Sequence, residues 1–227
     1  MTISGIVKSS LVDYPGLVCC VLFVPGCNFD CYFCHNRRLL EGGGDKLTGG
    51  YIDSFLSERE GFLDAVAISG GEPTLMRDLP EFVRYLKGFG YKVKVDTNGS
   101  SPETVEKLIK YGCDYFAVDY KAPAAMYRGI CRGCADARNV IDTIKLLARS
   151  GAEFEVRTTV IPELDEKALL EIAAELPRVP RYVLNRYKKP EYFLPGDEQR
   201  IEAPALSAAE IKSIALKLKK YQPDIVI

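Results

Sequence analysis

The stretch "VCCVLFVPGCNFDCYFCHN", residues 18–36, joins an apolar run to three closely spaced cysteines. Residues 18–24 are apolar throughout, which is typical of a strand that is buried on both faces of a parallel sheet. Cys27, Cys31 and Cys34 follow directly. Parallel α/β sheets and barrels place their chemistry at the carboxyl ends of their strands, so this order predicts a site at the end of the first strand.

The rest of the chain repeats this apolar run and alternates it with amphipathic stretches. Further strands are predicted at 64–70, 91–96, 114–119, 153–161 and 181–187. Helices are predicted between and after them, at 51–60, 77–90, 101–112, 135–151, 165–177 and 207–222. Right-handed crossovers would wrap six such units into a curved sheet, whereas eight would close it. The predicted fold class is α/β, an open (β/α)6 partial TIM barrel.

Local signals refine these boundaries. Ser101 is predicted to cap the helix at 101–112, and glycines are predicted to end helices at Gly90, Gly112 and Gly151. The final "DIVI" (224–227) predicts an edge strand, and "GGGD" (42–45) predicts a mobile loop.

Composition limits the class of protein. The 227 residues include 47% hydrophobic ones, with 30 basic and 31 acidic side chains, and no stretch has the composition of a linker, so one domain spanning 1–227 is expected. The net charge of -1 excludes the basic excess of a nucleic-acid-binding protein. Without a signal sequence or membrane-length apolar run, the protein is expected in the cytoplasm. Its eight cysteines are then ligands or redox thiols.

The three clustered cysteines have the spacing C-x3-C-x2-C. Zinc usually takes four ligands, and His35 directly after the last cysteine could supply the fourth. Three thiolates could instead hold three irons of a [4Fe–4S] cluster and leave the fourth iron open. An open iron would favour reaction over storage. The spacing favours the iron–sulfur cluster over zinc or a plain group of buried thiols.

The motif C-x3-C-x-aromatic-C, filled by Cys27, Cys31, Phe33 and Cys34, resembles the signature of the radical S-adenosylmethionine (SAM) superfamily. "SLVDYPG" (10–16) before it and "CHN" after it resemble the activating enzymes of glycyl-radical enzymes. The likeness is greatest to activators of anaerobic ribonucleotide reductase, which are related to those of pyruvate formate-lyase. Lys188 stands where the formate-lyase activators commonly carry histidine, which favours the first type.

The resemblance implies a cytoplasmic, anaerobic oxidoreductase. It would cleave SAM reductively at a [4Fe–4S] cluster to a 5′-deoxyadenosyl radical, which takes a glycine Cα hydrogen from a partner glycyl-radical enzyme. The electron would come from a flavodoxin- or ferredoxin-like donor. No acid or base is needed, which agrees with a single histidine. Two alternatives stay open: a small radical SAM enzyme acting on a free metabolite, such as a deazapurine-forming one, and a non-catalytic iron–sulfur or zinc protein.

The resemblance also implies site residues. Those expected to bind SAM flank the last cysteine or lie at strand ends: Phe33, His35, Asn36, Gly70, Gly71, Glu72, Thr97, Asn98, Lys121, Arg157 and Val160. The glycine pair would receive the amino group of SAM, Lys121 its carboxylate, and Phe33 and Val160 its adenine. A monovalent cation is expected at Asp96, Thr97 and Asp119, and Asp13 is expected near the peptide substrate.

Structural alternatives exist for several of these residues. The "GG" pair could form an ordinary turn, a strand-end aspartate could cap a helix, and Arg157 could form a surface ion pair. "DYPG" (13–16) could be a simple β-turn. Outside the cluster, Cys131 and Cys134, with Cys113, could bind an accessory metal or form a redox couple, but plain reduced thiols are favoured. Cys19 and Cys20 are expected in the core.

Overall fold

The computed structural model describes residues 1–40, 44 and 46–227. Within them, eight strands form one sheet in chain order. The strands are β1 Gly5–Ser10, β2 Cys19–Val24, β3 Ala65–Gly70, β4 Lys92–Thr97, β5 Tyr115–Asp119, β6 Glu153–Val160, β7 Tyr182–Arg186 and β8 Ile225–Val226. Strands β2 to β8 are parallel, and β1 pairs antiparallel with β2. The six predicted strands are β2 to β7, and the predicted edge strand is β8.

Strand β1 was not predicted from the sequence. Its residues are half-buried or exposed, so it lacks the apolar run by which the central strands are recognised. The predicted mobile loop "GGGD" falls mainly outside the described residues, at positions 42, 43 and 45.

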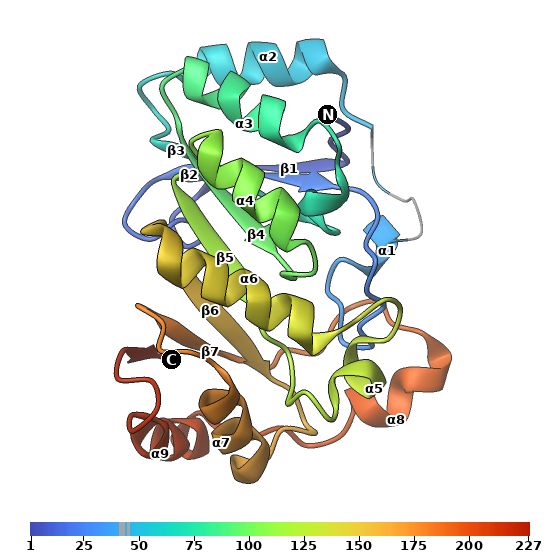
Figure 1. The fold of residues 1–227 in the computed structure, drawn as a ribbon. Helices are drawn as coiled ribbons and strands as arrows, with labels where there is room; N and C mark the ends of the chain where they lie inside the picture. The colour runs from blue at the N-terminus through green and yellow to red at the C-terminus, as the bar shows by residue number, and fades with distance from the viewer. Residues whose placement is uncertain (41–43, 45) are drawn as a thin grey trace.

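The six predicted helices all form, and they lie on one face of the sheet (Figure 1). They are α2 Gly49–Glu58, α3 Leu79–Gly88, α4 Pro102–Lys110, α6 Ala137–Ser150, α7 Glu166–Glu175 and α9 Ala208–Leu218. Short helical segments that were not predicted occur in the connections: α1 Arg37–Leu40, η1 Pro73–Leu75, α5 Tyr127–Cys131, η2 Pro195–Asp197 and α8 Glu198–Ile201. The alternation of strands and helices confirms the open α/β barrel.

The predicted helix ends are mostly confirmed. Gly90, Gly112 and Gly151 have positive φ angles of 85°, 85° and 75°, the left-handed conformation that ends helices and favours glycine. Ser101 stands at the start of α4, but its side chain makes no capping hydrogen bond. Its hydroxyl lies 2.9 Å from that of Thr104 instead. Ser101 therefore occupies the predicted N-cap position, but the predicted capping by its side chain is wrong.

The two faces of the sheet bury different side chains. On the helix-covered face, branched residues such as Val66 and Ile68 of β3 enter the main core. On the inner face, a smaller cluster contains Cys19, Ala65 and Ala67. Cys20 joins the main core while Cys19 joins the inner cluster, as expected for neighbours on one strand. Tyr14 and Tyr115 also belong to this inner cluster.

No helix among the described residues has both the length and the hydropathy needed to cross a membrane.

Candidate active site

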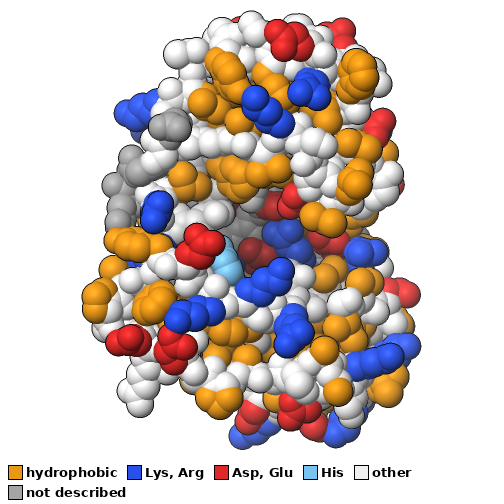
Figure 2. All heavy atoms as spheres, turned by 180° about the vertical axis from the view of Figure 1, so that it is seen from behind, with side chains coloured by type: hydrophobic (Ala, Val, Ile, Leu, Met, Phe, Trp, Pro, Cys, Tyr) orange, Lys and Arg blue, Asp and Glu red, His pale blue; other side chains and the backbone are white. Residues whose placement is uncertain are grey.

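The inner face opens into a cavity of about 240 Å³ at the carboxyl ends of β2 to β6. Figure 2 shows this side of the molecule hollowed near its middle, with the single histidine, His35, at the edge of the hollow and both acidic and basic side chains in and around it. The cavity is lined by the cysteine loop after β2 and by the ends of β3, β4, β5 and β6. The site therefore lies where the order of strand and cysteines predicted it.

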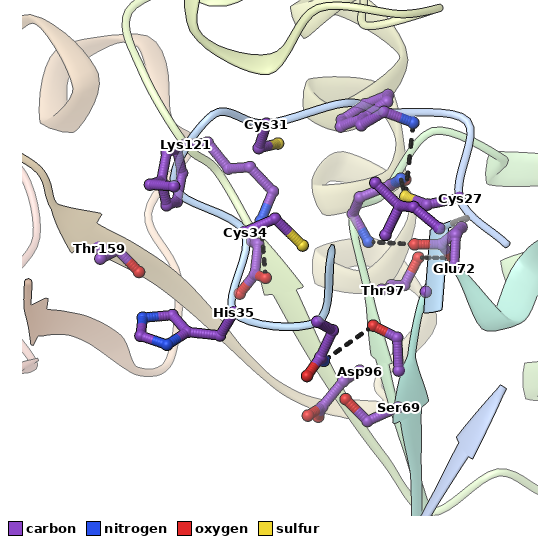
Figure 3. Close-up of a pocket in the computed structure, with 18 of the residues that line it drawn as sticks. Cys27, Cys31, Cys34, His35, Ser69, Glu72, Asp96, Thr97, Lys121 and Thr159 are labelled. Carbon is purple, nitrogen blue, oxygen red and sulfur yellow. Dashed lines mark hydrogen bonds and ion pairs between the residues drawn. The ribbon is translucent and has the colours of Figure 1, made fainter. Parts of the chain in front are cut away.

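The three clustered cysteines all line this cavity. Their sulfur atoms lie around one space, while the His35 imidazole points away from them (Figure 3). The loop is held by its own backbone, since the Cys34 amide donates to the Cys31 carbonyl at 3.1 Å. The Phe29 amide also donates to the Cys27 sulfur at 3.4 Å. This loop presents three thiols from one short segment.

Burial changes the acid–base behaviour of these thiols. It raises the pKa of Cys27 to about 12 and also raises the pKa of Cys34. The pKa of Cys31 is raised well above its usual value by a hydrogen bond with Cys131 and by burial. Three thiols that resist ionisation alone need a bound cationic group to become thiolates. The donor set therefore fits an iron–sulfur cluster.

A mononuclear zinc site fits less well. In the described part of the chain, no three His, Cys, Asp or Glu side chains are grouped so as to hold one metal ion, and His35 faces away from the sulfurs. In an iron–sulfur cluster each iron takes its own thiolate. Three separate thiols around a shared space suit that arrangement.

The glycine pair after β3 packs against the start of the cysteine loop. A Cβ atom on Gly71 would lie 1.8 Å from the Gly26 carbonyl oxygen, and Gly70 has a φ of 116°. The Glu72 amide donates to the Gly26 carbonyl at 2.8 Å, and the Asn36 side-chain amide donates to the Gly70 carbonyl at 3.0 Å. Both glycines line the cavity, so the close backbone approach joins two of its walls.

Glu72 connects the end of β4, which forms a third wall of the cavity, to the cysteine loop and the end of β3. Its carboxylate is 1% exposed and accepts hydrogen bonds from the Thr97 hydroxyl at 2.6 Å and the Asn98 amide at 2.6 Å. It also accepts from the backbone amide and hydroxyl of Thr74. The Asn98 side-chain amide in turn contacts the Cys27 sulfur at 3.8 Å. This network connects the ends of β3 and β4 to the first cysteine.

Two carboxylates, Asp96 and Asp119, meet cationic side chains from neighbouring strands on the opposite wall. Arg157 of β6 donates through Nε to Asp119 at 3.0 Å and through Nη1 to Asp96 at 3.4 Å. Lys121 donates to Asp119 at 2.9 Å, and Lys94 forms an ion pair with Asp96 at 2.9 Å. Arg157, Lys121 and both carboxylates line the cavity, whereas Lys94 does not, so paired charges of both signs lie beside the thiols.

These charges are mutually stabilised. Burial alone would raise the pKa of Asp119, but Arg157 and Lys121 outweigh it and hold that pKa well below its usual range. Burial opposes the charge on Lys121, yet Asp119 outweighs it and raises the pKa of Lys121. The Lys121 ammonium also lies 5.9 Å from the centre of the Phe33 ring. Asp119, Lys121 and Arg157 therefore remain charged near neutral pH.

The three residues predicted to bind a monovalent cation already have protein partners. The Thr97 hydroxyl donates to Glu72, and Asp96 and Asp119 form the ion pairs just described. The ordinary ion pair considered for Arg157 is therefore present, but it lies in the cavity and not on the outer surface.

The cavity includes nearly all the predicted site residues. Two lie outside its lining. Val160 is fully buried in the main core, because alternate residues of β6 face opposite sides. Thr159 takes the lining position, and the adenine contact of Val160 stays a prediction. Asp13 follows the antiparallel strand β1, at the amino ends of the parallel strands. Its carbonyl accepts a hydrogen bond from Lys94 at 2.6 Å.

Several lining or supporting residues were missed in the sequence. Ser69 and Thr159 line the cavity, and alternation along β3 and β6 from Gly71 and Arg157 could have identified them. Lys94 is 1% exposed, and a lysine within the apolar run 91–96 was an available signal. Phe29 and Leu40 also line the cavity, but nothing in the sequence distinguishes them from core residues.

The remaining cysteines do not form a second cluster of thiols. Cys113 is buried at the start of β5, where its thiol donates to the carbonyls of Val93 and Tyr115. Cys134 is exposed, whereas Cys131 is fully buried and contacts Cys31. Among the described residues, these cysteines belong to no group of three His, Cys, Asp or Glu side chains that could hold a metal ion.

A curved parallel sheet with a three-thiol loop at its carboxyl edge is the architecture of enzymes that hold an iron–sulfur cluster inside a partial barrel. The model of the radical SAM superfamily matches residues 21–176. The chain belongs to the radical SAM superfamily, and its family implies a [4Fe–4S] cluster and SAM.

Individual relatives agree with this assignment. A Methanocaldococcus jannaschii protein named "putative glycyl-radical enzyme activating enzyme" is 32% identical, over 99% of this chain and 95% of its own. The structure of Streptococcus suis SuiB bound to S-adenosylmethionine shares the fold with a TM-score of 0.67 and 15% identity, over 91% of this chain and 51% of that one. A domain of pyruvate-formate lyase-activating enzyme from Bacteroides vulgatus has a TM-score of 0.56 and 20% identity, over 72% of this chain and 99% of that domain.

Proposed function

We propose that this protein activates a glycyl-radical enzyme, with anaerobic ribonucleotide reductase as the partner. When bound, the reduced cluster supplies the electron that cleaves SAM to methionine and a 5′-deoxyadenosyl radical, which takes a hydrogen atom from the Cα of a partner glycine. The observation that carries the proposal is that the three thiols of the cysteine loop line one cavity together with the paired side chains of Lys121 and Arg157. The relative from M. jannaschii, aligned over nearly its whole length, supports activation of a protein.

The chain's own residues would bind and orient the substrate in this cavity. Cys27, Cys31 and Cys34 would hold the cluster. Lys121 lines the cavity and has donors beyond the one bonded to Asp119, so its ammonium could also bind the carboxylate of SAM. The loop carrying Gly70 and Gly71 offers backbone carbonyls to its amino group, and Phe33 offers an apolar surface to its adenine. The partly closed barrel would keep water from the reacting atoms.

His35 and Asn36 would lie beside the nucleoside, as both line the cavity. Asn36 has a fixed position because its amide is bonded to Gly70. Thr97 and Asn98 would act through the Glu72 network that shapes the wall. Thr159 replaces Val160 as the contact from the end of β6.

The predicted monovalent cation stays a prediction. To take it up, Asp96 or Asp119 would have to share its carboxylate with the cation in addition to Arg157 and the lysines. SAM affinity that rises with potassium but not with tetramethylammonium would support the cation. Equal SAM affinity in both salts would mean that the lysine and arginine side chains balance the two carboxylates without a bound cation.

The decisive experiment uses the full chain reconstituted anaerobically with iron and sulfide. The protein is reduced with photoreduced deazaflavin and mixed with SAM and purified anaerobic ribonucleotide reductase. Electron paramagnetic resonance (EPR) should then show a glycyl-radical doublet, with 5′-deoxyadenosine and methionine formed. Pyruvate formate-lyase in place of the reductase tests the choice of partner, and reduced flavodoxin or ferredoxin in place of deazaflavin tests the donor.

Two cysteine variants provide a matched comparison. Cys31→Ala should lose the cluster and all SAM cleavage, whereas Cys134→Ala, which removes an exposed thiol, should retain both. A wild-type protein that forms 5′-deoxyadenosine with hydrogen from a small molecule, and no protein radical, would overturn the activating function in favour of a metabolite enzyme. Four bound irons without any SAM cleavage would indicate a non-catalytic iron–sulfur protein.

A further inference from the structure

Arg200 of α8 connects the cysteine loop to two other segments of the chain. Its guanidinium donates to the Glu163 carboxylate, through Nε at 2.7 Å and through Nη2 at 3.0 Å. It also donates to the Gly129 carbonyl of α5 at 3.3 Å, and α5 and α8 lie side by side (Figure 1). Its Cζ atom lies 3.9 Å from the centre of the Tyr32 ring. One side chain thus joins α8, α5 and the connection after β6 to the cysteine loop.

Tyr32 transmits this contact to the cavity. It lies between Cys31 and Phe33, which both line the cavity. Tyr32 itself is fully buried and lies outside the lining. Its ring packs edge to face against Phe33, with 5.3 Å between the ring centroids. A shift of the Tyr32 ring would therefore move both the neighbouring thiol and the Phe33 ring.

The chemistry of arginine suits all of these contacts at once. Two nitrogens of Arg200 bond the two oxygens of Glu163, while the flat face of the guanidinium stacks on the Tyr32 ring. The attraction between a cation and an aromatic ring is strongest where water is excluded, and Tyr32 is 0% exposed. A lysine ammonium could keep the charge, but it has no planar fork and no flat face.

A second ion pair fastens the neighbouring segment η2. The Asp197 carboxylate is 3% exposed and accepts hydrogen bonds from both terminal nitrogens of Arg132, one of them at 2.9 Å. Arg132 belongs to the turn 131–134, whose backbone forms two hydrogen bonds of 2.9 Å with the cysteine loop, at Asn28 and Asp30. Through this turn η2 supports the start of the cysteine loop, as α8 supports its middle.

The cysteine loop needs such support. Residues 25–36 contain no helix or strand, so their arrangement depends on contacts with other segments. Three thiolates hold one cluster only when their sulfurs keep the positions that three irons require. Arg200, Glu163 and Asp197 lie outside the lining of the cavity. Their effect on a bound cluster must therefore pass through the loop.

We propose that Arg200 is a positioning residue for the iron–sulfur cluster, which holds Tyr32 and thereby keeps the three thiols of the cysteine loop in the arrangement that the cluster needs. Contacts behind the ligands of a metal commonly change its affinity by about 10- to 100-fold when they are removed. The proposal rests on the proposed function only in requiring a bound [4Fe–4S] cluster.

The test measures how fast the anaerobically reconstituted protein, without SAM or a partner, loses iron to the chelator bathophenanthroline. Arg200→Met removes the charge and the hydrogen bonds, and it should lose iron roughly tenfold faster than the wild type. Arg200→Lys keeps the charge without the planar fork and should lose iron at an intermediate rate. Tyr32→Phe keeps the ring and should match the wild type, whereas Tyr32→Leu should be as fast as Arg200→Met.

Arg181→Met is the matched control. Arg181 also donates through Nε to a glutamate, Glu155, at 3.0 Å, but it precedes β7, at the amino end of that strand. In the cluster-free protein both Arg→Met variants should lower the free energy of unfolding. Only Arg200→Met should speed the loss of iron and change the EPR signal of the reduced cluster, because only Arg200 contacts the cysteine loop.

A double variant tests the route through Tyr32. Arg200→Met combined with Tyr32→Leu should lose iron no faster than Arg200→Met, since both changes remove the same contact. Accelerations that multiply would overturn this route. Equal rates in the wild type and Arg200→Met would overturn the positioning role, and so would an equal acceleration by Arg181→Met, which would indicate general destabilisation.

The two proposals fail in different ways. Should Arg200→Met not fold, Arg200→Lys decides, and a rate equal to that of the wild type would refute the positioning role. A protein whose iron loss follows the expected pattern but which never cleaves SAM would keep the positioning role and refute the activating function.

Discussion

The Glu72 carboxylate accepts a 2.6 Å hydrogen bond from the Thr97 hydroxyl, across the ends of neighbouring strands β3 and β4. Glu72 sits in a sequence that resembles a SAM-binding motif, but its carboxylate is occupied by protein donors. Its role is therefore to hold two walls of the cavity together. A ligand in this cavity would meet a surface that these hydrogen bonds have already shaped.

Replacing Glu72 tests that role. Glu72→Gln replaces one carboxylate oxygen with an NH2 group, which would face the donor of either Thr97 or Asn98, because these two bond to different oxygens. We expect a loss of roughly 1 to 3 kcal/mol in the free energy of unfolding and weaker SAM binding. Urea unfolding and SAM titration measure the two effects. Glu106→Gln, exposed on α4 and paired with Lys110, should change neither, and an equal effect of both variants would contradict the prediction.

The glycine pair gives a steric prediction. Gly71→Ala would place a methyl group 1.8 Å from the Gly26 carbonyl oxygen, so the two loops must separate. Such overpacking should cost about 1 to 3 kcal/mol in unfolding free energy and abolish SAM cleavage. Gly88→Ala at the end of α3 has nothing within 4 Å of the added methyl. It should stabilise the protein by up to about 1 kcal/mol, and a tolerated Gly71→Ala would mean that the loops are not held in contact.

The sequence predicted the central fold well because apolar runs and helical periodicity report burial directly. It missed β1, whose side chains are half-buried or exposed, and the short helices of the connections. It predicted most residues of the cavity through motifs at strand ends, but Val160 lies in the core and Thr159 in the lining, because the one-residue alternation of a strand decides which side each faces. The contact between Cys131 and Cys31 could not be predicted from the sequence, because no local pattern indicates that two segments so distant in the chain lie side by side.

The ion pairs of Asp119 predict a pH dependence of stability. Arg157 and Lys121 outweigh burial and lower the pKa of Asp119 from its usual 3.8. A depressed pKa contributes stability that is fully present above the unfolded value and is lost as pH falls through the folded value. Asp119→Asn should therefore cost about 3 kcal/mol near neutral pH, and the difference from wild type should shrink as pH falls below 3.8.

Urea unfolding at several pH values measures this difference. Asp142→Asn, at an exposed position on α6, serves as the control and should track the wild type throughout. A gap between Asp119→Asn and wild type that stays constant down to pH 2 would show that the carboxylate charge is not what stabilises this wall.

Substitutions of two neighbouring residues at the end of β6 should have opposite effects on SAM affinity and on stability. Thr159 lines the cavity and Val160 lies in the core. Thr159→Leu should reduce SAM affinity with little change in stability, because it fills space that the ligand needs. Val160→Ala should instead cost about 2 kcal/mol in unfolding free energy through a buried void, with SAM affinity retained by the folded protein. The reverse pattern, seen by SAM titration and urea unfolding, would return the adenine contact to Val160.

Thiol reactivity in the cluster-free protein should separate the eight cysteines. Thiolates are the reactive form, and a pKa of about 12 leaves roughly one Cys27 side chain in 10⁴ ionised at pH 8. Cys113 and Cys20 are buried as well. Iodoacetamide at pH 8, followed by mass spectrometry of peptides, should therefore modify the exposed Cys134 first. Equal rates at Cys27 and Cys134 would mean that the cysteine loop opens without its cluster, and the cavity described for the metal-free chain would then be formed only on binding.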